Sequence, residues 1–242
     1  SFSVAILIIG LFMFDGVEYM MNLQFNVAQR EDISISFNRP LTPDVELDIL
    51  RIPGVAVAEP FRMVPARFHS GHLKKEAGIT GRSVAHELQR IITADGDIIP
   101  LPLSGIVISK FMADHLQVRR GDRVSVEILE GRRPWREVEI VEVVEDFMGV
   151  SAYMEIGQLH RLVGGARSVS GANVKVALGQ QEKVSRTLSD LPAVAGVASP
   201  RSTYEIFQKQ MSEGLFIGIF FLIGFSSVIA VSVIYNGARI SL

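Results

Sequence analysis

The sequence contains no cysteine, which excludes disulfide bonds, thiolate catalysis and cysteine-ligated zinc. It also contains no Gly-x-x-x-x-Gly-Lys-Ser/Thr motif, so these 242 residues carry no P-loop for ATP. The formal net charge is only −2, which gives no global attraction to nucleic acid. Enzymes that use thiolates and nucleic-acid-binding proteins are therefore the first classes that the composition disfavours.

Charge is missing from both ends of the chain. Residues 214–238 form an uncharged run that would be about 37 Å long as a helix, enough to cross a hydrocarbon core of roughly 30 Å. The uncharged residues 1–14 would span only about 21 Å. No basic segment precedes them and no small-residue cleavage site follows, so we expect the second half of a transmembrane helix rather than a signal peptide.

The flanking charges predict an orientation in the inner (cytoplasmic) membrane. Asp15 and Glu18 follow the first apolar run, and Arg239 follows the second. The positive-inside tendency then places the middle of the chain outside the cytoplasm. Residues 17–29 contain no glycine or proline, and residues 201–213 also read as helical. We therefore expect both membrane helices to continue into the middle domain as stalks.

Two segments of the middle region resemble each other, residues 32–61 and residues 172–200. Each begins with alternating apolar residues (Ile33, Ile35 and Phe37; Val174, Val176 and Leu178), the pattern of a strand with one buried face. A polar helical stretch and a second strand follow in each. Each segment is thus a β-α-β unit, and two such units can share one open sheet.

Different sequence features predict the two helices. In the first unit, Thr42 is the expected N-cap, with Pro43 at the first helical position. In the second, Val184, Leu188 and Leu191 supply the apolar face. A similar proline-containing segment ends each predicted helix, Ile-Pro-Gly-Val at 52–55 and Leu-Pro-Ala-Val at 191–194.

The stretch between the two units reads as mainly β with short helices. Asp95-Gly96 between two Ile-Ile pairs is a hairpin signal. Residues 106–108 form a short strand that leads into a helix at 110–116, and residues 124–128 alternate as another strand. A return strand follows the turn at 130–134, and a helix is expected at 155–163.

We therefore predict an α+β fold in which a split βαβ (ferredoxin-like) subdomain, formed by both flanks, carries an inserted β-rich subdomain. Transmembrane or stalk helices flank it. The predicted parts are the first membrane helix and stalk (1–30), the first half of the split subdomain (31–62), the insert (63–168), the second half (169–200), and the second stalk and membrane helix (201–242).

No catalytic constellation is visible in the sequence. Ser83 and Ser104 have no neighbouring base, and His69 and His72 sit in a Ser-Gly turn with no third metal ligand in sight. We therefore predict no catalytic, cofactor-binding or metal residues. The candidate partner contact is the hairpin tip, where an aromatic residue lies among arginines: Arg132, Arg133, Trp135 and Arg136. The alternative is a tryptophan folded onto the sheet beside solvated arginines.

With this layout, the chain resembles the FtsX-like (MacB-type) permease family of ABC transporters. The resemblance rests on residues 105–128, GIVISKFMADHLQVRRGDRVSVEI, on the repeated Leu-x-x-(Leu/Ile)-Pro-x-Val pattern, and on residues 235–242, which resemble the entry into a cytoplasmic coupling region. It implies a domain that transmits ATP-driven motion of membrane helices in order to export or transfer a lipoprotein, lipid, peptide or drug-like substrate.

The resemblance also implies the partners. ATP would bind a separate cytoplasmic ATPase subunit, and a second permease copy or homologue and a periplasmic adaptor or substrate protein would complete the assembly. Two other interpretations remain open. One is a two-span sensor or scaffold that regulates a periplasmic partner such as a cell-wall hydrolase. The other is a membrane-tethered enzyme.

Overall fold

The computed structural model divides the chain into two compact units, residues 1–200 and 201–242. In the first unit it describes residues 12, 16–17, 19–85, 87–93, 96–145 and 151–200, with 24–26 described by backbone alone. In the second it describes residues 201, 202, 204, 206, 209, 210, 214, 218, 220, 223 and 224, all of them helical. The predicted membrane spans lie largely outside these residues. Within the described part of the chain, no helix combines the length and the apolar character needed to cross a membrane.

Near the N-terminus, the described residues from 16 to 28 are helical, and the last of them form a π-helical segment, η1 (Leu23–Ala28). Ala28 is buried at the end of this helix. The next residue, Gln29, forms an isolated antiparallel bridge with Gln89. The helix therefore ends in contact with a segment about 60 residues further along the chain.

One part of the first unit is a sheet in the order β11-β1-β10-β2, with antiparallel neighbours. Its strands are β1 (Ile33–Leu41), β2 (Val55–Ser70), β10 (Val169–Val176) and β11 (Val194–Ala198). Helix α2 (Val45–Leu50) connects β1 to β2, and α5 (Gln181–Ser189) connects β10 to β11. Both helices pack into one core with the sheet: Ile33, Ile35, Ile49, Ala58, Ala172, Val174, Val176, Val184 and Leu188. Residues far apart in the sequence thus share one hydrophobic core.

The predicted helix ends differ from the observed ones. The N-cap of α2 is Asp44, not Thr42, because residues 43 and 44 form a turn before the helix begins at Val45. Thr42 contributes only its carbonyl oxygen, which accepts the Val45 N–H at 3.2 Å. Helix α5 ends at Ser189, so Leu191 lies beyond it and is partly exposed. Pro192 disfavours a helical conformation at the residue before it, which accounts for this early end.

The remaining strands close into a barrel. They are β3 (Leu73–Arg82), β6 (Ile106–Ser109), β7 (Arg123–Ile128), β8 (Trp135–Val144) and β9 (Ala152–Glu155). Pairing runs from β2 through β3, β9, β6, β8 and β7 and returns to β2. The interior is filled by alternate strand residues, among them Val64, Phe68, Val124, Val126 and Ile140. Such closure leaves these strands without a free edge.

Two helices and a small hairpin complete the barrel. Helix α3 (Lys110–Leu116) follows β6 directly, as the sequence predicts, and buries Met112 and Leu116. Helix α4 (Ile156–Val163) has Glu155 as its N-cap, whose carboxylate accepts the N–H groups of Gly157 and Gln158. The predicted hairpin near Asp95-Gly96 is present as β4 (Ile91–Ile92) paired with β5 (Ile98–Ile99), although Asp95 itself lies outside the described residues. The α+β class with a sheet-rich core is therefore confirmed.

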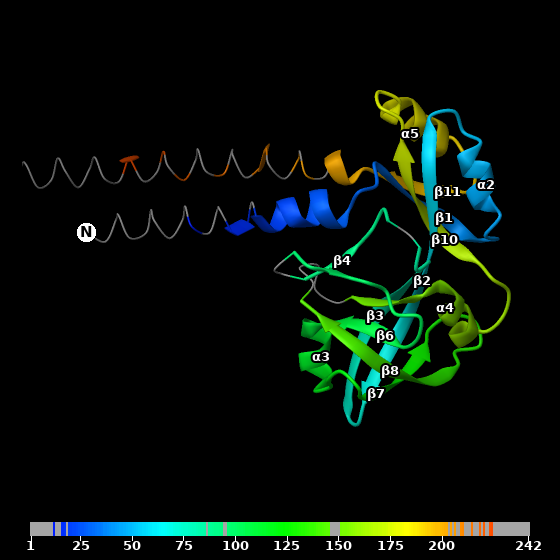
Figure 1. Ribbon diagram of the computed structural model, residues 1–242, viewed down its shortest axis with the longest axis vertical. Helices are drawn as coiled ribbons and strands as arrows, with labels where there is room; N and C mark the ends of the chain where they lie inside the picture. Colours follow the sequence, from blue (N-terminus) through cyan, green and yellow to red (C-terminus); the bar gives the residue numbers. More distant parts are fainter. Residues whose placement is uncertain are drawn as a thin grey trace, which may run out of the picture. The chain divides into compact units, whose positions relative to one another are not determined.

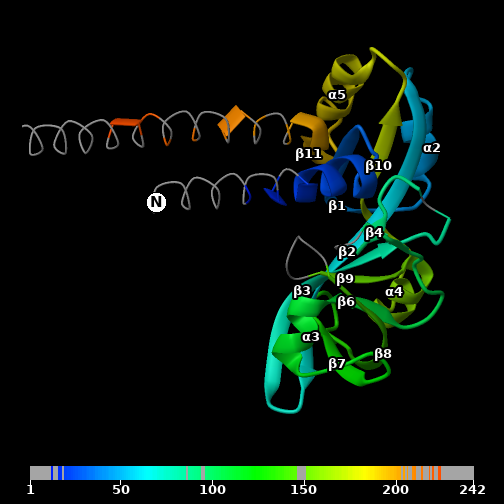
Figure 2. The ribbon, with the colours of Figure 1, turned by 60° about the vertical axis from the view of Figure 1, so that its left-hand side comes forward.

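Strand β2 belongs to both parts (Figures 1 and 2). Its residues Val55–Phe61 pair with β10, whereas Arg62–Ser70 pair with β3. At the change of partner, Arg62 is only 4% exposed. Its guanidinium contacts Glu130 Oε1 at 2.5 Å and donates to Ser170 Oγ at 2.8 Å. A buried cation is costly without such partners, so this ion pair joins the barrel turn at Glu130 to the strand both parts share.

Gly171 sits where β10 approaches its two neighbours most closely. A Cβ atom there would lie 2.2 Å from the Ile35 carbonyl oxygen and 2.6 Å from Phe61 Cζ. Real Cβ contacts do not come that close, and the carbonyl belongs to the ladder itself. Only glycine therefore allows the register observed between β1, β10 and β2.

We expect Gly171→Ala to lower the free energy of unfolding by about 3 kcal/mol, because the added methyl group must push strands apart. Thermal or urea unfolding of the purified chain measures this. Gly196→Ala in β11 is the matched control, since its Cβ would meet only the Ser36 hydroxyl at 3.3 Å. Equal destabilisation by both substitutions would contradict the explanation.

Candidate functional site

Of the predicted contact residues, Arg132 and Arg133 lie in the turn between β7 and β8, and Trp135 and Arg136 are the first two residues of β8. Trp135 is 53% exposed, and its ring packs on His69 of β2, with centroids 4.6 Å apart at an interplanar angle of 37°. The indole therefore has one face against the barrel and keeps about half of its surface open to solvent. The packing on His69 agrees with the alternative in which the tryptophan folds onto the sheet, and the contact role stays a prediction.

The arginines of the turn are exposed. None of the three makes an ion pair with a residue that the structure describes, and Arg136 Nη1 donates to the Trp135 carbonyl oxygen at 3.0 Å. Arg133 has φ 51°, in the left-handed region that favours glycine. The turn thus presents positive charge around an exposed indole. We call Arg132, Arg133, Trp135 and Arg136 the arginine–tryptophan turn.

Next to this turn, charged side chains of β2, β3 and β7 form an ionic cluster. Arg67 donates to Glu127 at 2.8 Å and to Glu76 at 2.7 and 3.0 Å, so it bridges β2, β3 and β7. His69 Nε2 lies 3.6 Å from the same Glu127 carboxylate. The contact between His69 and Trp135 could not be predicted from the sequence, because 66 positions separate the two residues. Only the register of β2, β7 and β8 brings them together.

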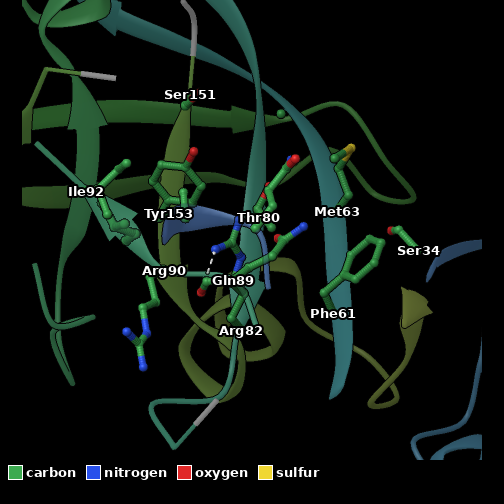
Figure 3. A pocket seen from close by; sticks show the side chains of 14 residues that line it. Ser34, Phe61, Met63, Thr80, Arg82, Gln89, Arg90, Ile92, Ser151 and Tyr153 are labelled. Carbon is green, nitrogen blue, oxygen red and sulfur yellow. Dashed lines mark hydrogen bonds between the residues drawn. The ribbon is translucent and has the colours of Figure 1, made fainter. Parts of the chain in front are cut away.

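A second site is a pocket of about 390 Å³ beside the end of the N-terminal helix (Figure 3). Its walls come from the N-terminal connection, β1, β2, β3, the segment around β4, and β9. The lining residues are Ala28, Gln29, Ser34, Phe61, Met63, Gly78, Thr80, Arg82, Gln89, Arg90, Ile91, Ile92, Ser151 and Tyr153. We call this the junction pocket, because both parts of the first unit and the helix end contribute to it.

Arg82 is the central charged residue of the junction pocket. It is 9% exposed, and in Figure 3 it lies with Gln89 between Tyr153 and Phe61. Its guanidinium carbon is 4.9 Å from the centre of the Tyr153 ring, and its Nη1 donates to the Gln89 carbonyl oxygen at 3.3 Å. The aromatic face and the carbonyl together compensate a cation that is almost completely removed from water.

Glu31 lies behind the pocket lining and is 5% exposed. One carboxylate oxygen accepts the Gln89 side-chain N–H at 2.7 Å, whereas the other has no hydrogen-bond partner within the described residues. Burial raises the pKa of Glu31, and the hydrogen bond from Gln89 and the charge of Arg82 only partly oppose it. Glu31 therefore keeps its proton to a higher pH than an exposed glutamate.

The segment that follows the N-terminal helix forms hydrogen bonds with two different elements, the loop after β3 and strand β10. Toward the barrel, Arg30 N–H donates to Leu88 O at 2.7 Å, and Arg90 N–H donates to Ala28 O at 2.8 Å. Leu88 N–H in turn donates to the Glu59 carboxylate on β2 at 3.0 Å. The segment 28–30 is thus held to a loop that is itself held to β2.

Toward the sheet, Asp32 is the anchoring residue. Its N–H donates to Val174 O at 3.0 Å, and its carboxylate accepts the Val176 N–H at 2.9 Å and contacts Lys175 Nζ at 3.1 Å. Lys175 Nζ also donates to Arg30 O at 2.7 Å. Residues 28–32 therefore make polar contacts with β10 and with the loop that follows β3. We call them the junction segment.

The sequence predicted neither the junction pocket nor the burial of Glu31, Arg62 and Arg82. Charged residues are rarely buried, so each reads as solvated until its partners are known. His69 lies at the end of β2 and His72 in the following turn. Within the described residues, no group of three or more His, Cys, Asp or Glu side chains is arranged to hold a metal ion.

We expect Glu31→Gln to stabilise the first unit at neutral and mildly alkaline pH. The carboxyl is ionised there in the unfolded chain, so folding must either bury its charge or bind a proton, and both cost free energy. A carboxyl whose pKa is raised on folding makes its full contribution to the free energy of unfolding below its unfolded pKa of about 4.3. This contribution is lost as the pH rises through the folded pKa. The difference in Tm between variant and parent should thus grow from pH 5 to pH 8. A constant or reversed difference would contradict the raised pKa.

The sequence matches no protein-family model and no curated protein. Among solved structures, the chain is similar to the extracellular domain of the noncanonical ABC-type transporter YknZ from Gram-positive bacteria, with a TM-score of 0.48 and 16% identity, covering 69% of this chain and 99% of that domain. It is also similar to the periplasmic region of MacB from Actinobacillus actinomycetemcomitans, with a TM-score of 0.47 and 10% identity, covering 79% of this chain and 98% of that region. Both of these solved structures are extracellular or periplasmic parts of their proteins.

Proposed function

We propose that residues 31–200 are the extracytoplasmic domain of an ABC transporter permease subunit in the inner membrane. In this proposal, the sheet with α2 and α5 is the split βαβ, ferredoxin-like subdomain, and residues 1–30 and 201–242 are membrane and stalk helices. The uncharged runs at both ends and the family-like phrase at residues 105–128 support it. The domain has no chemistry of its own, and ATP binds a separate cytoplasmic ATPase subunit.

The observation that carries the proposed role is the double attachment of the junction segment. Its residues bond to the loop after β3 through Leu88 and Arg90, and to β10 through Val174 and Lys175. That loop is in turn bonded to β3 of the barrel, because the Gln89 carbonyl oxygen accepts from Arg82 Nη1 at 3.3 Å. Hydrogen-bonded strands are stiff, so displacement of the N-terminal helix would reach both parts of the domain together. A second permease copy or homologue would undergo the same motion, and the transported lipoprotein, lipid, peptide or drug-like molecule would be moved by it.

A length change at the helix end tests this coupling. We expect two glycines inserted between Ala28 and Gln29 to slacken the link while residues 29–32 keep their partners. These 242 residues contain no cysteine, so within them a His72→Cys spin label at the exposed hairpin turn is site-specific, and any cysteine elsewhere in the full permease or its ATPase is replaced by serine. In the full permease purified with its ATPase, the label-to-label distance between two copies should change when ATP binds, and the insertion should abolish that change.

The control inserts two glycines between Gly164 and Gly165, in the exposed turn after α4, where the distance change should persist. Basal ATP hydrolysis should remain in both insertions. A nucleotide-dependent distance change that survives the insertion at Ala28 would reject the coupling. Absence of any associated ATPase would favour the sensor or scaffold instead.

We further propose that the arginine–tryptophan turn contacts an extracytoplasmic partner, an adaptor or substrate protein. An exposed indole that rests on His69 is already ordered, so little conformational entropy is lost on docking. Arg132, Arg133 and Arg136 surround it with donors for carboxylates. Aromatic and arginine side chains of this kind commonly contribute most of the binding energy of an interface.

We expect Trp135→Ala to weaken partner affinity by about tenfold or more, with little change in Tm, because the indole is half exposed. Titration of the reconstituted complex with the partner, read out as stimulated ATP hydrolysis, measures this. Phe111→Ala is the matched control, since Phe111 is 55% exposed and pairs with Lys75 on the barrel. Unchanged stimulation in Trp135→Ala would remove the turn from the interface.

A further inference from the structure

The junction pocket has the size and the mixed lining of a small-molecule site. Its volume of about 390 Å³ lies at the lower end of the range of about 300–1,000 Å³ that is usual for such sites. It is too small for a folded partner. Elements separated by more than 120 positions in the sequence form its walls, from Ala28 to Tyr153. A ligand there would contact the helix end and the barrel at once.

The charges of the lining are one-sided. Among the lining residues that the structure describes, Arg82 and Arg90 are charged, and none is an aspartate or glutamate. Glu31 accepts a hydrogen bond from the lining residue Gln89, and its negative charge is disfavoured by burial. Charge-assisted hydrogen bonds from guanidinium groups are the usual way in which proteins hold carboxylate, sulfate and phosphate groups.

The rest of the lining is amphipathic. Phe61, Met63, Ile92 and Tyr153 offer apolar surface, and Figure 3 shows Phe61 and Met63 on one side of Arg82 with Tyr153 and Ile92 on the other. Met63 is 52% exposed, so its thioether lies at the open rim. Thr80 and Ser151 add hydroxyl groups to the lining. An apolar surface next to a buried guanidinium fits a ligand with an anionic head and a short apolar body.

We propose that the junction pocket binds a small amphipathic anion, whose carboxylate, sulfate or phosphate group contacts Arg82 and whose apolar body packs against Phe61 and Met63. Binding itself does not depend on the proposed transport role. If that role holds, occupancy would also be coupled to the motion of the junction segment, because Ala28 and Gln29 form part of the same wall.

Octanoate is a suitable probe, and octanamide is its neutral counterpart of the same length. The full chain in nanodiscs, labelled with ¹³C at its methionine methyl groups, reports binding through the Met63 resonance, which Met63→Gln identifies. We expect a saturable shift of that resonance with octanoate and at least tenfold weaker binding of octanamide. Arg82→Gln should weaken octanoate binding at least tenfold, whereas Arg123→Gln on the exposed start of β7 should not.

Two further variants keep the test decisive if Arg82→Gln does not fold. Thr80→Glu and Thr80→Gln place side chains of equal size in the pocket wall, one charged and one neutral. Octanoate should bind Thr80→Gln at least tenfold more tightly than Thr80→Glu. Absence of a saturable shift in the parent chain, equal binding of octanamide, or equal binding by the two Thr80 variants would overturn the proposal. None of these outcomes bears on the coupling measured with the His72 label.

Discussion

The structure of the first unit depends on one strand that serves two sheets. β2 pairs with β10 through Phe61 and with β3 from Arg62 onward, and its far end closes the barrel against β7. A continuous strand is extended and hydrogen-bonded along its length, so the two parts cannot move apart without breaking ladder bonds. Arg62, buried at the change of partner with Glu130 and Ser170, adds a specific ionic contact at the same point.

The second constraint is the way the chain enters this unit. The junction segment lies between the loop at 87–90 and β10, and Asp32 and Arg30 bond to residues of β10. A helix that ends in a free loop would transmit little displacement. Here, residues 28–32 bond both to the loop at 87–90 and to β10, so identified hydrogen bonds connect the end of η1 to the rest of the unit. The same crowding buries Glu31 and Arg82 and forms the junction pocket.

Much of the fold could be predicted because local patterns agree with the final packing. The alternation at Ile33 and Ile35, at Val174 and Val176, and at Val124 and Val126 places these residues in the observed cores. The spacing of Val184 and Leu188 does the same for α5. Helix ends were predicted less well. Asp44 rather than Thr42 is the N-cap of α2, because residues 43 and 44 form a turn before the helix begins. The arginine–tryptophan turn was recognised from residue type alone, and its contact role stays a prediction.

By itself, the sequence determined the periodicity of the strands and helices, the placement of charge between two uncharged runs, and the α+β class, because each depends on neighbours along the chain. Only the tertiary structure decided that the barrel closes, that His69 supports Trp135, and that Glu31, Arg62 and Arg82 are buried. Those features depend on contacts such as Arg62 with Ser170, 108 positions apart, and Gln89 with Glu31, 58 positions apart. Such pairs leave no periodic signal, and the energy of a buried charge depends entirely on which partners the fold brings to it.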